Sequence, residues 1–243
     1  MKNLNCFNFS TTLKSLSNIF NIPENELLSF LIINKNCELS EDELFAKLES
    51  EKQIMTSYDA TIFFHLTRCH IKGITNILKN GLYSTAKSYT EIITFIYAFD
   101  NHNMSANDFK LYSKNLIEKN KNLNNYINKD KGPYALLIND INLNDYHFLS
   151  EEQGPEMVED IFKQLYSNCY KEKLIKYNKK TLPVVVVFRK NIAELKFLKT
   201  ALYFLWCIIS NNIWKKNYNC SIDFLRDYGM EIKKNDILKI IKL

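Results

Sequence analysis

Two polar side chains that could bind a ligand together, His65 and Thr67, lie in an apolar run that begins at Ile62. Alternate side chains of a β-strand point to the same face, so a spacing of two places this imidazole and this hydroxyl side by side. Such a pair can hydrogen-bond a sugar hydroxyl group. A histidine in an apolar strand can equally be a core residue, and threonine is common in strands for its β-propensity alone. The pair is therefore a candidate binding site with a structural alternative.

A short amphipathic helix is expected directly after this strand, over residues 71–79. Isoleucine or leucine recurs at helical spacing, at positions 71, 74, 77 and 78. Gly81 has the place of the C′ glycine that ends many helices. The strand, the helix and the glycine together predict one local unit that holds His65 and Thr67 in place.

The remaining pattern predicts an α+β fold without internal repeats. Pro23 begins one helix near the N-terminus, and Ser40 with Glu43 forms a capping box that begins another. We expect residues 1–56 to form a small helical region that packs on the main domain or on a partner protein, and residues 57–243 to form an α+β domain. Strands are expected at 62–67, 134–138, 183–188, 222–225, 230–232 and 237–241, and helices at 71–79, 90–99, from 105 to about 127, from 155 onward and at 192–209.

Composition excludes some classes of protein and leaves others open. Hydrophobic residues make up 46% of the 243 residues and charged residues 24%, which is typical of a globular protein. The net charge of +5 permits a polyanionic partner without requiring one. The six cysteines form no C-x-x-C pair, so we expect neither a metal site nor a disulfide framework. No signal peptide is readable and no apolar run could span a bilayer, so we expect a cytoplasmic protein or an effector exported by another route.

A family resemblance is carried by Phe63-Phe64-His65-Leu66-Thr67 and the following Ile77-Leu78-x-x-Gly81-Leu82. This run resembles the opening of the ADP-ribosyltransferase fold, in which an aromatic–His–x–Thr/Ser strand precedes a helix that ends in I-L-x-x-G-L. Bacterial toxins, poly-ADP-ribose polymerases and RNA 2′-phosphotransferases share that fold. The resemblance covers residues 63–82, and it implies a mixed, split β-sheet core with helical insertions.

The resemblance also implies a substrate, NAD, and roles for particular residues. His65 would bind the adenosine ribose and Thr67 would help to hold the nucleotide. Tyr83 or Tyr89 would stack on the nicotinamide. Arg68 alternates to the face opposite His65, but it lies near the strand end, where it could reach the pyrophosphate. An ion-paired surface position is the alternative for this arginine.

A carboxylate near the C-terminus would complete such a site. It would bind the ribose next to the nicotinamide and stabilise the positive charge that develops as the glycosidic bond breaks. Glu231 and Asp223 are the two candidates, and Glu231 is favoured because family members usually place a glutamate on a late strand.

The function implied by the resemblance is that of an NAD-dependent ADP-ribosyltransferase-like protein, a bacterial toxin, effector or phage-defence component that modifies a nucleic acid or a protein. One alternative is a catalytically inactive relative that acts as a binding or antitoxin-like module. Another is a nucleic-acid-binding protein of unrelated fold, in which case binding would weaken steeply with salt.

Overall fold

The computed structural model describes residues 1–83, 85–100, 105–119, 132–139, 150, 152, 154–212 and 221–243. The chain divides into two compact units, each built from three segments. Unit 1 contains Met1–Phe64, Ala135–Asp140 and Val187–Ile222, and unit 2 contains His65–Tyr134, Ile141–Val186 and Asp223–Leu243. None of the helices in the described ranges is long and apolar enough to cross a membrane.

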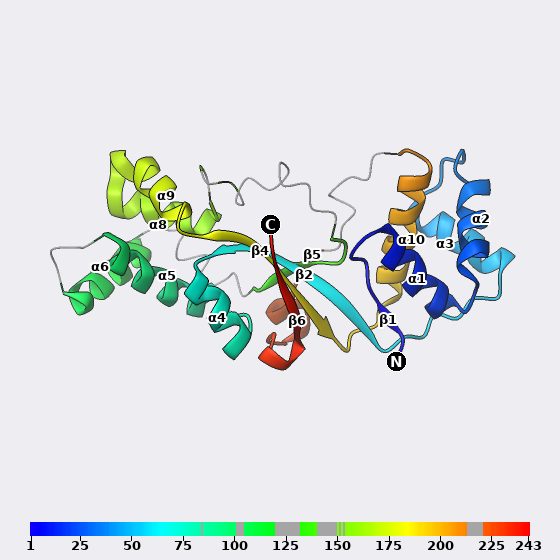
Figure 1. Cartoon of the computed structure of the whole chain (residues 1–243), viewed down its shortest axis with the longest axis horizontal. Helices are drawn as coiled ribbons and strands as arrows, with labels where there is room; N and C mark the ends of the chain where they lie inside the picture. The colour runs from blue at the N-terminus through cyan, green and yellow to red at the C-terminus, as the bar shows by residue number, and fades with distance from the viewer. Residues whose placement is uncertain are drawn as a thin grey trace. The chain divides into compact units, whose positions relative to one another are not determined.

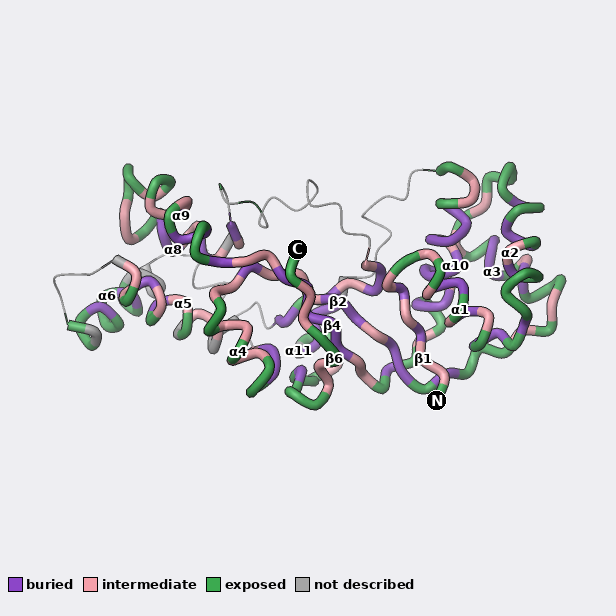
Figure 2. Tube along the Cα trace, viewed as in Figure 1, coloured by how far each residue is buried: buried purple, intermediate pink, exposed green. Residues whose placement is uncertain are grey.

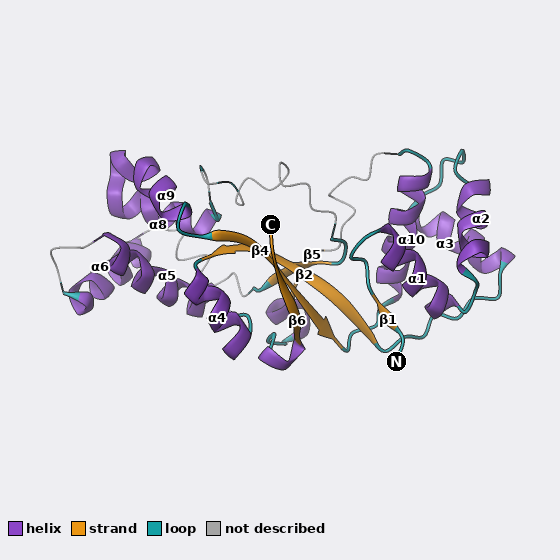
Figure 3. Cartoon of the chain, viewed as in Figure 1, coloured by secondary structure: helices purple, strands orange, loops and turns teal. Residues whose placement is uncertain are grey.

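The fold is α+β, as the sequence predicted, with helices and strands interspersed along the chain (Figure 1, Figure 3). The strands are β1 (Asn3–Leu4), β2 (Ala60–Cys69), β3 (Tyr134–Leu136), β4 (Leu182–Lys190), β5 (Ser221–Asp223) and β6 (Ile237–Lys242). The α-helices are α1 (Phe9–Phe20), α2 (Glu24–Ile33), α3 (Glu41–Glu51), α4 (Ile71–Asn80), α5 (Thr85–Asp100), α6 (Ala106–Lys119), α8 (Glu156–Tyr166), α9 (Tyr170–Asn178), α10 (Leu195–Ile209) and α11 (Phe224–Tyr228). The described residues also form two 3₁₀ turns, η3 (Ser167–Cys169) and η5 (Lys234–Asp236).

The strands form one open sheet in the order β5-β3-β2-β4-β6, with β1 added to β2. β2 pairs with β3 in the antiparallel sense, with Phe64 opposite Leu136, and with β1 in the parallel sense. The valine run of β4 is buried from Val184 to Phe188, which confirms the prediction of a strand covered on both faces (Figure 2). β2 and β4 therefore form the centre of the sheet.

In unit 1, the three N-terminal helices pack on α10. The Ser40 capping box is confirmed, because the Ser40 hydroxyl accepts from the Glu43 backbone N–H while the Glu43 carboxylate accepts from the Ser40 N–H. Trp206 on α10 donates its indole N–H to the Asn34 carbonyl at the end of α2, at 3.1 Å. The predicted N-terminal helices thus share a core with a helix that lies far along the chain.

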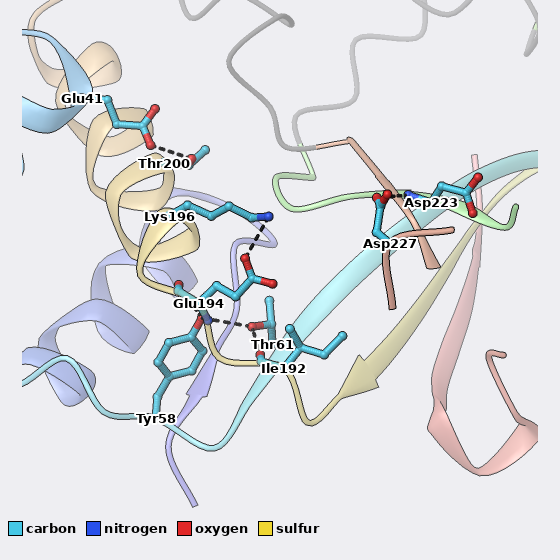
Figure 4. A network of polar contacts seen from close by, with 9 residues as sticks. All are labelled: Glu41, Tyr58, Thr61, Ile192, Glu194, Lys196, Thr200, Asp223 and Asp227. Carbon is cyan, nitrogen blue, oxygen red and sulfur yellow. Dashed lines mark hydrogen bonds and ion pairs between the residues drawn. The ribbon is translucent and has the colours of Figure 1, made fainter. Parts of the chain in front are cut away.

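A polar network also ties the start of β2 to the segment between β4 and α10 (Figure 4). The Tyr58 hydroxyl accepts from the Glu194 backbone N–H at 2.9 Å and donates to the Glu194 carbonyl at 3.0 Å. The Thr61 hydroxyl donates to the Ile192 carbonyl at 2.6 Å. Burial raises the pKa of Tyr58 to about 12, so the phenol stays protonated and keeps its donor.

In unit 2, four helices, α5, α6, α8 and α9, share a second apolar core. The aromatic ring of Tyr177 on α9 contacts Phe95, Phe99 and Phe162, with centroid distances of 5.2–5.9 Å. Ser105 caps α6 by accepting the Asp108 N–H, as predicted. The expected extension of this helix to about residue 127 lies outside the described residues beyond Lys119.

The predicted strands near the C-terminus need correction. Residues 222–225 were expected to be extended, but the strand ends at Asp223 and α11 begins at Phe224. The Asp223 side chain accepts the Arg226 N–H at 3.1 Å, which is an N-cap interaction that favours a helix over a continued strand. Within the expected strand 230–232, Ile232 makes a single bridge. The predicted β6 and the turn at Gly229, whose φ is +62°, are present.

Candidate functional site

His65 lies on β2 and is half-buried. Its Nδ1 atom is 2.5 Å from the Tyr134 carbonyl oxygen. A carbonyl can only accept, so Nδ1 carries the proton and the lone pair of the neutral ring is on Nε2. Burial lowers the pKa of His65, and the bond to the carbonyl opposes this effect only in part. The residue is thus a neutral imidazole of fixed tautomer, with an acceptor atom on the side away from Tyr134.

Thr67 is also half-buried, and it shares a face of β2 with His65. Arg68 points to the opposite face and is only 8% exposed. Its Nε donates to the Thr181 hydroxyl at 2.8 Å, and one terminal nitrogen donates to the carbonyls of Asn178 and Thr181 at 2.9 and 3.3 Å. These bonds hold the turn between α9 and β4. They give the buried arginine a structural role that does not involve the pyrophosphate of NAD.

The helix expected at 71–79 is α4, and it is capped at both ends. At its start, His70 Nδ1 accepts the Lys72 N–H at 3.2 Å, and the imidazole packs on Phe95 with a centroid distance of 4.3 Å. Burial, followed by the charges of Lys72 and Lys180, lowers the pKa of His70. At its end, Gly81 donates to the Ile77 carbonyl at 2.8 Å, so the predicted glycine stop is confirmed.

Gly81 also permits a close approach between this helix end and the C-terminal segment. Its φ is +95°, and a Cβ added to it would lie 2.1 Å from the Ile232 carbonyl oxygen. The next residue, Leu82, donates its N–H to that same oxygen at 2.9 Å and pairs with Ile232 as an antiparallel bridge. Glycine at position 81 is therefore required for this contact between two segments that are distant in the sequence.

The bridge brings together the segments that carry two predicted site residues. Tyr83 directly follows Leu82 and Glu231 directly precedes Ile232, so this isolated bridge brings the segments of these two residues together. Tyr83 is half-buried and Glu231 is exposed. An aromatic ring and a carboxylate thus lie at the end of the helix that follows the His65 strand, within the same compact unit.

Asp223, the other predicted carboxylate, is 1% exposed and lies at the end of β5. Its backbone N–H donates to the Asp227 carboxylate at 3.0 Å, and its own Oδ1 accepts from Arg226. The Phe224 N–H donates to the Pro133 carbonyl at 3.3 Å, one residue before Tyr134. Phe224, the residue after Asp223, and His65 therefore contact successive parts of the Pro133–Tyr134 segment.

Tyr89, the second candidate for stacking on nicotinamide, packs against the helical core of unit 2. Its hydroxyl donates to the Ser113 carbonyl on α6 at 3.2 Å. Burial raises the pKa of this phenol. The contacts of Tyr89 serve the packing of α5 on α6, whereas Tyr83 directly follows the residue that bridges to the Glu231 segment.

Sequence reasoning did not identify Tyr134 and His70, which position the candidate residues. Tyr134 acts through its backbone carbonyl, which every residue has, so no sequence signal marks it. His70 had a usable signal, because it directly precedes an amphipathic helix and its ring nitrogen can accept from the first turn. No metal-binding cluster of three or more His, Cys, Asp or Glu occurs within the part of the chain that the structure describes.

Comparisons with known proteins add no relative. The chain matches no protein-family model, no curated protein and no solved structure.

Proposed function

We propose that this protein is an NAD-dependent ADP-ribosyltransferase that modifies a macromolecule. The observation that carries the proposal is the pairing of Leu82 with Ile232, which brings the segment of Glu231 to the segment of Tyr83 at the end of the helix that follows the His65–Thr67 strand. This is the combination that the resemblance of residues 63–82 to ADP-ribosyltransferases requires: a histidine, an aromatic ring and a late carboxylate in one compact unit.

The residues divide the binding of NAD between them. His65 Nε2 accepts a hydrogen bond from a hydroxyl of the adenosine ribose, because Nδ1 is already committed to the Tyr134 carbonyl. Thr67 holds the nucleotide from the same strand face. Tyr83 stacks on the nicotinamide ring through the face of its phenol.

Glu231 acts at the bond that breaks. The glycosidic bond between ribose and nicotinamide cleaves with its electron pair passing to the nicotinamide nitrogen, which leaves as a neutral molecule. The positive charge that develops on the ribose is stabilised by the Glu231 carboxylate, which also accepts a hydrogen bond from the neighbouring ribose hydroxyl. A nucleophilic oxygen or nitrogen of the acceptor then attacks the ribose carbon and loses its proton.

Release of nicotinamide from NAD⁺, with and without nucleic acid or protein acceptors, tests the proposal. We expect Glu231→Gln to lower the rate by about 10²–10³-fold, the loss that follows removal of one preorganised electrostatic group. Glu172→Gln on α9 is the matched control, because Glu172 is an exposed glutamate paired with Lys176, and it should leave the rate unchanged. His65→Ala should weaken NAD⁺ binding in calorimetry.

Absence of nicotinamide release by the wild-type protein with every acceptor would refute the transferase. If the wild-type protein nevertheless binds NAD⁺, the inactive binding module becomes the better assignment. Equal rates for Glu231→Gln and Glu172→Gln would leave a transferase whose carboxylate is a different residue.

A further inference from the structure

Lysines make up most of the surface that α9 presents to solvent. Residues 170–180 contain five lysines and one glutamate, so this segment carries a charge of +4 in a protein whose net charge is +5. Leu174, Tyr177 and Asn178 form the buried side of the helix. The lysines occupy other positions, and they are Lys171, Lys173, Lys176, Lys179 and Lys180. Four of the five are exposed and Lys173 is half-buried.

Lys72 on α4 extends this set across the end of the sheet. The turn after α9 leads into β4 beside the end of β2 that leads into α4 (Figure 1). Burial lowers the pKa of His70, and the charges of Lys72 and Lys180 lower it further, so both ammonium groups lie near this imidazole. We call Lys72 and the five lysines of residues 170–180 the lysine face.

Helix electrostatics does not account for the lysine face. Cations are favourable near the C-terminus of a helix and unfavourable in its first turn, where the dipole is positive. Lys72 and Lys171 are each the second residue of a helix. Among the residues that the structure describes, these two form no ion pair, and neither do Lys179 and Lys180, while Glu172 pairs with Lys176. Repulsion between these charges therefore disfavours the free protein, and a bound polyanion would relieve it.

The surroundings of the lysine face favour a nucleic-acid duplex over a single strand or a membrane. Ammonium groups lie over two of the nearby rings, Lys173 over Tyr166 at 5.3 Å and Lys180 over Phe99 at 4.7 Å from the centroid. Both rings also pack against the helical core of unit 2, so they leave little surface on which unpaired bases could stack. α9 has no exposed large hydrophobic side chain, which insertion into a bilayer would need.

A duplex offers phosphates at the density that the lysine face requires. The nine residues of α9 extend over about 14 Å. Double-stranded DNA carries one negative charge per about 1.7 Å of its axis, so several phosphates lie within reach of this helix.

We propose that the lysine face binds the phosphate backbone of a nucleic-acid duplex without reading its sequence. Phosphate contacts position a duplex but carry no sequence information. The binding does not depend on NAD. The consequence that a nucleic acid is the acceptor of ADP-ribose rests on the proposed function.

Fluorescence anisotropy of a labelled DNA duplex, titrated with the full-length protein at a series of salt concentrations, tests the binding. If the four lysines without an ion pair each neutralise one phosphate, the logarithm of the binding constant should fall with the logarithm of the salt concentration with a slope of about −3.6. The double variant Lys171→Gln, Lys179→Gln should make this slope shallower by about 1.8. Glu172→Gln removes the one negative charge from α9 and should tighten binding of the duplex, although nicotinamide release at saturating acceptor stays unchanged.

The double variant Lys110→Gln, Lys114→Gln on α6 is the matched control. Both lysines are exposed and belong to unit 2, and the pair of exchanges lowers the net charge by the same amount. This variant should retain the wild-type slope.

Three results would overturn the binding surface: a wild-type slope near zero, an equal loss of slope in the two double variants, or equally tight binding of polyglutamate, which would indicate an acidic protein as the partner. If protein acceptors stimulate nicotinamide release and the duplex does not, the transferase stands and the assignment of a nucleic-acid acceptor fails. If the protein binds the duplex with the expected slope but never releases nicotinamide, the proposed function fails and the binding surface stands.

Discussion

Replacing Gly81 with alanine tests the contact that connects α4 to the segment of Glu231. Gly81 has φ +95° and ψ −171°, a region that only glycine enters readily, and placing another residue there costs about 1–3 kcal/mol. The new Cβ would also lie 2.1 Å from the Ile232 carbonyl oxygen, so the two backbones must separate. Losing the hydrogen bond from Leu82 to that oxygen adds about 1 kcal/mol. We expect the free energy of unfolding to fall by about 2–4 kcal/mol in total.

Gly229→Ala is the matched control for this substitution. Gly229 also has a positive φ, +62°, but an added Cβ would meet nothing within 4 Å. Gly229→Ala should lower the free energy of unfolding by about 1–2 kcal/mol, from backbone strain alone. Urea unfolding measures both free energies, and amide hydrogen exchange at Leu82 reports whether the bridge survives. If Gly81→Ala destabilises no more than Gly229→Ala and Leu82 stays protected, the close approach of the two segments is refuted.

Substitutions at two further residues, Arg68 and His70, test the two sides of the β2–α4 corner. Arg68→Met should lower the free energy of unfolding by about 2–4 kcal/mol, because the carbonyls of Asn178 and Thr181 lose their charged donor. Arg68→Lys should recover part of this loss in the same urea experiment. If Arg68→Met were as stable as the wild-type protein, the structural role assigned to Arg68 would be contradicted. The lowered pKa of His70 means that the unfolded chain takes up its proton more readily, so wild-type stability should fall as the pH decreases below about 6.5. His70→Asn retains a neutral cap and should reduce this decline between pH 7.5 and 5.5, and identical pH profiles would show that His70 does not contribute to it.

Predictions that depended on local rules agree with the structure. The capping box at Ser40 involves groups three residues apart, and the helix end at Gly81 involves one turn of helix. Each feature is therefore determined by a short stretch of sequence. The valine run of β4 reads as a buried strand because a continuous β-branched segment has no polar face to expose. The face shared by His65 and Thr67 also follows from strand periodicity alone.

The predictions that failed, and the contacts that were missed, depend on partners distant in the sequence or on a choice between two local structures. Residues 222–225 combine apolar side chains with Asp223, a pattern compatible with a strand or with a capped helix, and the hydrogen bond to the Arg226 N–H selects the helix. The pairing of Leu82 with Ile232 joins two backbones, and nothing in either side chain specifies the other. The approach of the Glu231 segment to the Tyr83 segment therefore could not be predicted from the sequence.

The N-terminal helices pack on a helix of the same chain that is synthesised much later. α1, α2 and α3 pack on α10, which begins at Leu195. At a translation rate of roughly 5–20 residues per second, roughly 150 residues of intervening chain delay this helix by about 7–30 s. During that interval, buried residues such as Leu44 and Leu48 have no α10 to cover them. The nascent chain therefore exposes an apolar surface to chaperones, or to other nascent copies, before α10 packs on these helices and completes the core of unit 1.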